Sequence, residues 1–286
     1  MTFVSFWGEI LLLLDKKTEV PEMYGLFHIF FFALPVILAI VLWKVRKDPD
    51  ERFMRRLMLT VSVIVLLLEI YKQINYNFKY DGQNINFDYQ WYIFPFQFCS
   101  TPLYIGFLTA FTRKGKVHDA CCAYLATFAM FAGLCVMVYP AQVFVSTVGV
   151  NIQSMLCHGA MIMMSIYLFA TGYVKAEHKT ILRAIPVFAI CLVLAMIMNE
   201  AAYQGGILNG DVFNMFYISP YCEPSLPVYS SVQAAVPYPW CLIIYIIGFS
   251  LAAYLMLLVP MLVKFIRSKK STKSQKQAQK EEILVK

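Results

Sequence analysis

Seven apolar runs are the feature that most constrains what this chain can fold into. They lie near residues 22–44, 57–77, 91–112, 119–139, 150–172, 184–206 and 238–264. A bilayer core about 30 Å thick needs about 20 consecutive apolar residues for one helical crossing, and each run meets that need. Only 14% of the residues are charged, against about a quarter in soluble domains. The sequence therefore predicts an all-α, polytopic membrane helix bundle with seven transmembrane helices over residues 22–265.

Basic residues gather on one side of these runs. Of the 24 lysines and arginines, all but Lys16, Lys17, Lys72 and Lys79 lie at the ends of odd-numbered runs or in the segments that follow them. Cytoplasmic loops carry such an excess, so we expect the N-terminus outside and the C-terminus in the cytoplasm of a multi-pass cell-membrane protein. The net charge of +7 comes largely from this face, so we do not expect nucleic-acid binding.

The two ends of the chain and its longest loop are predicted to lie outside the membrane spans. Residues 1–20 are too short and too acidic for a span, and they predict an interfacial amphipathic helix. Residues 266–286 predict a basic, disordered cytoplasmic tail. The outer loop over residues 207–237 is long enough to cap a cavity. Most cysteines lie inside apolar runs, and only Cys222 and Cys241 flank a polar loop, which makes them the one pair considered for a disulfide.

Polar residues inside the predicted spans gather near the outer face. Cys99 lies eight residues after Trp91, and His158 lies eight residues after Val150. At 1.5 Å per residue, both are expected roughly 12 Å below the same membrane boundary. Ionisable residues inside a membrane are costly and indicate a functional site by default. We therefore predict a polar cavity that opens outward or sideways into the outer leaflet, near the remaining polar residues of the spans: His28, Glu69, Lys72, Gln73, Asn199, Glu200 and Tyr203.

Helical spacing refines this cavity. Glu69, Lys72 and Gln73 are separated by three and four residues, so they share one helix face. Pro102 cannot donate a backbone hydrogen bond within its helix, so we expect a kink in the third span beside Cys99. Gln97 lies about 200° from Cys99 around an ideal helix. Only a distortion of the helix would bring both side chains to one cavity.

Each of these residues also has a structural interpretation. A membrane cysteine often packs as a small apolar side chain, and a membrane histidine often bonds a neighbouring carbonyl, as His28 would. Glu69 with Lys72 would then link helices, and Asn199 would make an interhelical hydrogen bond. The matched depth of Cys99 and His158 on different helices favours a functional pair.

The segment Phe94-Pro95-Phe96-Gln97-Phe98-Cys99-Ser100 resembles the LP-x-x-L-C segment of the YwaF family of seven-helix bacterial membrane proteins. It also resembles their animal relatives, among them an ether-phospholipid acyltransferase, and this group is similar to the androgen-induced intramembrane hydrolases. In the animal acyltransferase the corresponding cysteine is the nucleophile, and a histidine follows nearly 60 residues later. Cys99 and His158 are 59 residues apart. Asn199 and the segment from Asn214 to Tyr217 resemble the asparagine-rich region of the family, although the Asn-Tyr pair is not contiguous here.

The resemblance implies an intramembrane lipid acyltransferase or lipase that acts on a membrane phospholipid or another acyl lipid. In apolar surroundings a thiol stays protonated at neutral pH, so Cys99 as nucleophile needs His158 as general base. The product of this step is an acyl-thioester intermediate. Ser100 and Thr101 are alternative nucleophiles. An oxyanion-stabilising role is expected of Gln97, Asn199 or Tyr203, and an orienting role toward His158 is expected of Glu69. The supporting or substrate-binding residues are Gln97, Glu69, Asn199, Tyr203, Lys72 and His28.

The main rival is a transporter or binding subunit for a small polar solute. It would need Glu69, Lys72, His158 and Asn199 but no nucleophile. A retinal photoreceptor is excluded because its seventh span needs a deep lysine, and residues 239–260 contain none. The spans contain no paired ligand spacing such as H-x-x-x-H, so we expect no metal or other cofactor.

Overall fold

The computed structural model describes residues 3–223, 226 and 229–285, with side chains described as far as residue 269. A short antiparallel hairpin is its only sheet over these residues, and helices make up the other regular elements. The α-helices and strands are α1 (Phe3–Leu14), α2 (Leu26–Val45), α3 (Glu51–Asn77), β1 (Phe78–Tyr80), β2 (Ile85–Phe87), α4 (Thr101–Phe111), α5 (Lys116–Ala126), α6 (Phe128–Val138), α7 (Val148–Ala170), α8 (His178–Gln204), α9 (Tyr229–Ala235) and α10 (Tyr238–Val285). The short 3-10 helices are η1 (Trp91–Ile93), η2 (Phe98–Ser100), η3 (Pro140–Gln142) and η4 (Met215–Tyr217).

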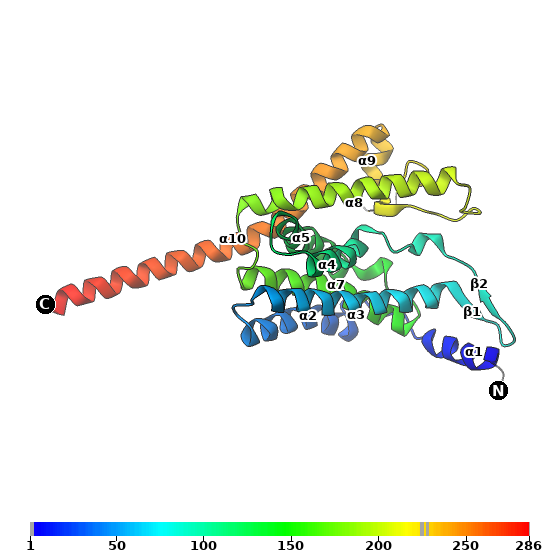
Figure 1. Ribbon diagram of the computed structural model, residues 1–286, viewed down its shortest axis with the longest axis horizontal. Coiled ribbons are helices and arrows are strands. Elements are labelled where there is room, and N and C mark those ends of the chain that lie inside the picture. Colours follow the sequence, from blue (N-terminus) through cyan, green and yellow to red (C-terminus); the bar gives the residue numbers. More distant parts are fainter. Residues whose placement is uncertain (1–2, 224–225, 227–228, 286) are drawn as a thin grey trace.

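Six helical segments in the described part of the chain are long and apolar enough to cross a membrane. They are α2, α3, the pair α5 and α6, α7, α8 and the first part of α10. Most of them lie along the long axis of the molecule in Figure 1. The prediction of an all-α bundle with several membrane-spanning helices is therefore confirmed. The predicted fourth span consists of two helices that meet at Thr127.

The predicted third span is not one continuous helix. Residues 94–97 are not helical, and α4 begins only at Thr101. Pro102 stands in the first turn of α4, where the missing N–H would have no helical partner in any case. The predicted kink inside a continuous helix is therefore wrong. The distortion comes instead from this non-helical stretch, and the Gln97 side chain bonds the backbone at Asn214 and Phe216.

The segment that contains α4 still runs beside α3 over most of its length. At one end Gln73 Nε2 donates to the Ile93 carbonyl at 3.0 Å. At the other end Arg55 Nε donates to the Ala110 carbonyl at 2.7 Å. Arg55 and Gln73 are 18 positions apart on α3, which corresponds to roughly 27 Å, close to the thickness of a bilayer core.

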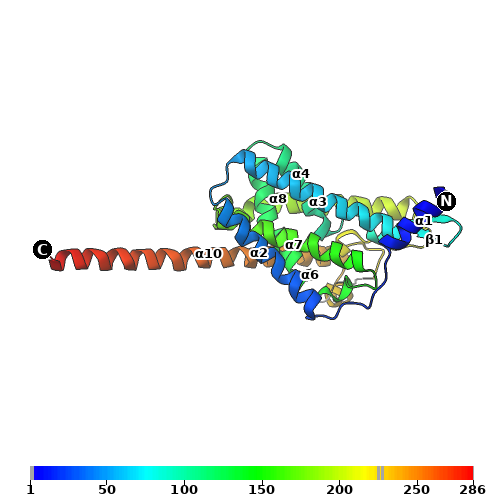
Figure 2. The ribbon, with the colours of Figure 1, turned by 90° about the horizontal axis from the view of Figure 1, so that it is seen from below.

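Helix α7 lies at the centre of the bundle. It packs against α2, α3, α5 and α6, and Figure 2 shows α2 and α6 beside it. Gly133 of α6 allows the closest approach, because an added Cβ would lie 2.7 Å from the His158 carbonyl oxygen and 3.0 Å from the Cβ of Met161. Small residues permit such backbone contacts between membrane helices. This contact fixes α7 at the level of His158.

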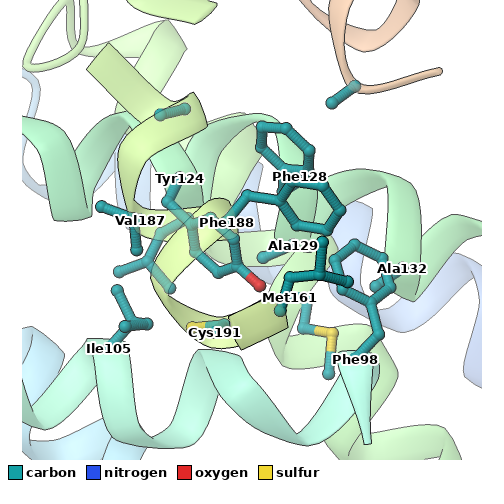
Figure 3. Close-up of a cluster of buried hydrophobic side chains, with 14 of the residues drawn as sticks. Phe98, Ile105, Tyr124, Phe128, Ala129, Ala132, Met161, Val187, Phe188 and Cys191 are labelled. Carbon is teal, nitrogen blue, oxygen red and sulfur yellow. The ribbon is translucent and has the colours of Figure 1, made fainter. Parts of the chain in front are cut away.

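An aromatic core joins η2, α6, α8 and α10. Figure 3 shows Phe128 beside Phe188, and their ring centroids are 4.6 Å apart in a stacked arrangement. Phe98 packs edge-on against Phe188 at 5.9 Å and against Phe249 at 5.1 Å. Phe98 immediately precedes Cys99, so the core holds the backbone at the cysteine.

The terminal segments differ in their contacts. The predicted N-terminal helix forms as α1, and Tyr71 and Asn75 of α3 both donate to the Leu14 carbonyl, at 2.7 and 3.2 Å. At the other end, α10 continues as a helix to Val285 and extends beyond the bundle (Figure 1), where the sequence predicts a disordered tail.

The long loop that begins after α8 contains η4 and α9. Residues 224, 225, 227 and 228 of this loop lie outside the described residues. Cys222 and Cys241, the pair considered for a disulfide, both carry free thiols.

Candidate functional site

Cys99 lies in η2, two residues before α4 begins, and borders a narrow cavity of about 40 Å³. The cavity walls come from α3, α4, α5, α6 and α7. Most of the lining side chains are apolar, and Ser62, Cys99 and Cys157 are the exceptions. The cavity beside the cysteine is therefore not the polar one that the sequence predicts. Its chemistry suits a hydrocarbon chain better than a polar solute.

His158 is buried in α7, and its two ring nitrogens have different surroundings. Its Nδ1 lies 2.7 Å from the Ser154 carbonyl oxygen. A carbonyl only accepts, so Nδ1 carries the proton of the neutral ring and Nε2 carries a lone pair. Nε2 is buried and has no hydrogen-bond partner among the described residues. His158 is thus held in the tautomer that a proton acceptor requires.

The other buried histidines differ from His158 in this respect. The backbone N–H of Tyr24 donates to His28 Nδ1 at 2.9 Å, and His28 Nε2 donates to the Met137 carbonyl at 2.7 Å. His118 also has both ring nitrogens bonded. We therefore place His28 outside the site, as a link between α2 and the end of α6. Among the described residues no cluster of three or more His, Cys, Asp or Glu side chains could hold a metal ion.

Glu69, Lys72 and Gln73 share one face of α3, as their spacing predicts. Glu69 Oε1 accepts a hydrogen bond from Gln73 at 2.8 Å and lies 2.9 Å from the Lys72 ammonium. Lys72 is also near enough to interact electrostatically with both the Cys99 thiol and the His158 ring. The orienting contact on His158 comes from its own helix, whereas the carboxylate of Glu69 is bonded within α3.

Gln97 and Asn199 both hold the backbone of η4 and the residue before it. Gln97 Nε2 donates to the Asn214 carbonyl at 2.9 Å, and the Phe216 N–H donates to Gln97 Oε1 at 3.0 Å. Asn199 Nδ2 donates to the Met215 carbonyl at 3.0 Å, and the Met215 N–H donates to Asn199 Oδ1 at 2.8 Å. The two amides that the sequence assigns to the oxyanion therefore act as positioning groups for this loop.

The loop is held in an unusual conformation near Cys99. Phe216 and Tyr217 have φ values of 59° and 58°, which are costly for bulky residues. Tyr217 is near enough to Cys99 for an electrostatic interaction, and so is Cys157. Sequence reasoning missed both as neighbours of Cys99. Two features of the sequence could have indicated them. Tyr217 ends the segment from Asn214 that resembles the family, and Cys157 directly precedes His158.

Tyr203 belongs to a different cavity. It borders a cleft of about 680 Å³ formed by the end of α8 and the loop that follows. Its hydroxyl lies 2.7 Å from Cys222 Sγ, and its ring stacks on Tyr221 with centroids 4.6 Å apart. The structure does not bring Tyr203 to the cavity that Cys99 borders.

A protein-family match covers most of the chain and includes Cys99 and His158. The model described as the TMEM164 family matches residues 23–273. The chain belongs to the TMEM164 family. This is the animal ether-lipid acyltransferase family, so the predicted resemblance to that group is confirmed, while kinship with the YwaF family stays a prediction. No curated protein and no solved structure matches the chain.

Proposed function

We propose that this member of the TMEM164 family is an intramembrane lipid acyltransferase or lipase, with Cys99 as nucleophile and His158 as general base. The observation that carries the proposal is the buried Nε2 of His158, which has no hydrogen-bond partner in the described part of the chain and whose Nδ1 is fixed by the Ser154 carbonyl. Membership of the family is compatible with a membrane protein that modifies lipids.

The proposed reaction has two steps. Cys99 Sγ attacks the ester carbonyl of an acyl lipid while its proton passes to His158 Nε2. The ester C–O bond breaks, and the departing lysolipid oxygen takes the proton from Nε2. The acyl group remains on Cys99 as a thioester. A lysolipid hydroxyl, or water in a lipase, then gives its proton to Nε2 and attacks the thioester. The acyl group leaves with the acceptor, and the thiolate recovers its proton from His158.

Lys72 is our candidate for stabilising the negative charge of the tetrahedral intermediate. Its ammonium lies within electrostatic range of both Cys99 and His158, whereas Gln97 and Asn199 are engaged with the backbone of the loop at η4. A fixed positive charge at a developing oxyanion is a common source of catalysis. Glu69 then holds Lys72 in place.

The cavity beside Cys99 is proposed to receive the acyl chain. A volume of about 40 Å³ is too small for a long chain, so side chains must move when substrate enters. Met58, Met161 and Met164 line the cavity, and methionine side chains adapt readily to new shapes. The apolar walls therefore support a lipid substrate.

The topology is part of the proposal. The segment 91–111 runs beside α3 between its contacts at Ile93 and Ala110, which supports a seventh crossing made partly of non-helical chain. Basic residues gather in and around the connections from α2 to α3, α4 to α5 and α7 to α8, and in the last part of α10. This distribution supports a cytoplasmic C-terminus and an external N-terminus. Cys99 and His158 would then act in the outer half of a cell membrane.

A transporter for a small polar solute is the rival function, and the side-chain contacts speak against it. It needs free polar groups, but Glu69 is paired with Lys72, and Asn199 is bonded to Met215. The apolar cavity at Cys99 also lacks the lining that a polar solute requires.

Cys99→Ser, with Cys135→Ser as the matched control at an exposed cysteine outside the cavity, tests the proposal. Purified protein is incubated with a phospholipid carrying a labelled acyl chain, and transfer of the label to lysolipid or its release as fatty acid is measured. We expect Cys99→Ser to lower the rate by about 100-fold or more, because a serine hydroxyl loses its proton far less readily than a thiol and is a weaker nucleophile. Cys135→Ser should stay near the wild-type rate. Full activity in Cys99→Ser would contradict the assignment.

A further inference from the structure

A second cleft lies at the opposite end of α3 from Lys72. It has a volume of about 400 Å³ and lies where α3 begins and α4 ends. Residues 51–59 of α3 face it, at least ten residues before Glu69, so roughly 15 Å or more along the helix separates it from Glu69 and Lys72. Its principal lining residues are Glu51, Arg52, Arg55, Arg56, Leu59 and Phe111.

The mouth of the cleft is positively charged. Arg52 and Arg56 are exposed and one helical turn apart, and neither pairs with a carboxylate within the described ranges. Arg55 is half-buried and donates to the Ala110 carbonyl at 2.7 Å, which ties α3 to α4 at the base of the cleft. Glu51 is the acidic lining residue, and it accepts a hydrogen bond from the backbone N–H of Lys114 at 3.1 Å. The lining side chains therefore carry a net positive charge.

The wall of the cleft that leads toward the membrane core is apolar. Leu59 lies one turn beyond Arg55 on α3, and Phe111 ends α4 with 66% of its surface exposed. Phe111 stacks on Phe107, one turn back along α4, with centroids 6.3 Å apart. The cleft thus combines guanidinium groups at its mouth with an apolar surface that continues along α4.

We propose that this cleft binds an anionic phospholipid from the leaflet at the basic face of the protein. Arg52 and Arg56 hold the phosphate, because guanidinium groups bond phosphate oxygens in a bidentate geometry. An acyl chain lies along Leu59 and Phe111. Basic pockets between membrane helices commonly receive lipid headgroups. A free phosphate ion would satisfy the arginines but would leave the apolar wall unused. The site is independent of the proposed acyl chemistry.

Equilibrium binding of fluorescent phosphatidic acid to the purified full-length protein in neutral detergent tests the proposal. Arg52→Gln with Arg56→Gln removes two charges from the mouth and leaves the structural Arg55 in place. We expect binding to weaken roughly 10- to 30-fold, since each basic residue near a lipid phosphate contributes a few-fold to affinity. Lys175→Gln with Lys179→Gln is the matched control, because it removes two exposed charges from the same face outside the cleft. An equal loss in this control would show general surface attraction and overturn the proposal.

Competition separates the lipid from a free anion. Unlabelled phosphatidic acid should displace the probe at far lower concentration than glycerol phosphate or inorganic phosphate, and Phe111→Ala should reduce that advantage. Equal displacement by inorganic phosphate would overturn the lipid assignment. Thermal unfolding of each variant verifies its fold, and Arg56→Gln alone, expected to weaken binding at least threefold, replaces the double variant if that variant unfolds. Unchanged affinity in a folded arginine variant would also contradict the site.

Discussion

Hydrogen bonding at single residues distinguishes the catalytic candidate from the structural histidines. His28 has a partner at each ring nitrogen, so it stabilises the contact between α2 and α6. His158 keeps a buried acceptor without a partner among the described residues. Leaving such a group unsatisfied costs about 1–3 kcal/mol. A destabilising arrangement of this kind is expected where function requires it.

This contrast predicts opposite effects for two equivalent substitutions. His28→Phe should lower the free energy of unfolding by about 1–3 kcal/mol, because the Met137 carbonyl and the Tyr24 N–H lose their partner. Its activity per folded molecule should stay near wild type. His158→Phe should abolish activity without a comparable loss of stability. Thermal unfolding and the acyl-transfer assay on both variants check this. A stable but inactive His28→Phe would place His28 in the site.

At the scale of elements, the segment before α4 shows what local pattern cannot predict. Hydropathy alone favours a span over 91–112, but residues 94–97 are not helical. Their groups find partners elsewhere: the Tyr104 hydroxyl donates to the Pro95 carbonyl at 2.6 Å, and Gln97 bonds the backbone at Asn214 and Phe216. The last two contacts join positions more than 110 residues apart. Long-range bonds of this kind outweigh local helix preference, and a single sequence does not reveal them.

The same contacts predict a positioning role for Gln97 and Asn199. Gln97→Ala or Asn199→Ala should speed amide hydrogen exchange in residues 213–219 by about tenfold, since each change removes two hydrogen bonds that hold a strained backbone. Gln204→Ala is the matched control, because its side-chain amide bonds Glu200 and Tyr221 instead. Lost activity with unchanged exchange in this loop would instead support a direct oxyanion role.

At the scale of the whole molecule, apolar length and helical period predicted the bundle and the shared face of Glu69, Lys72 and Gln73. These features depend only on spacing along the chain. The neighbours of Cys99 depend on the rotation of α7 and on the loop at η4, so Cys157 and Tyr217 were not predicted. The contact between His158 Nδ1 and the Ser154 carbonyl leaves Nε2 as the proton acceptor, and residue type alone does not predict this contact.

The charge asymmetry of the molecule predicts its orientation. A glycosylation acceptor inserted between residues 207 and 213, after α8, should be modified when the protein is synthesised with microsomes, because this loop is expected to be external. An acceptor inserted between residues 172 and 177, beside Lys175, should stay unmodified. The reverse pattern would contradict the proposed topology.

The central claim is that Cys99 carries the acyl group and His158 activates it. Purified protein is incubated with a phospholipid that bears a radiolabelled acyl chain, denatured, and treated with neutral hydroxylamine, which cleaves thioesters. We predict a hydroxylamine-sensitive label on the wild type and on Cys135→Ala, and none on Cys99→Ala. In His158→Ala the rate of label formation should fall by at least about 100-fold, as expected for loss of a general base. A label that persists in Cys99→Ala would contradict the account.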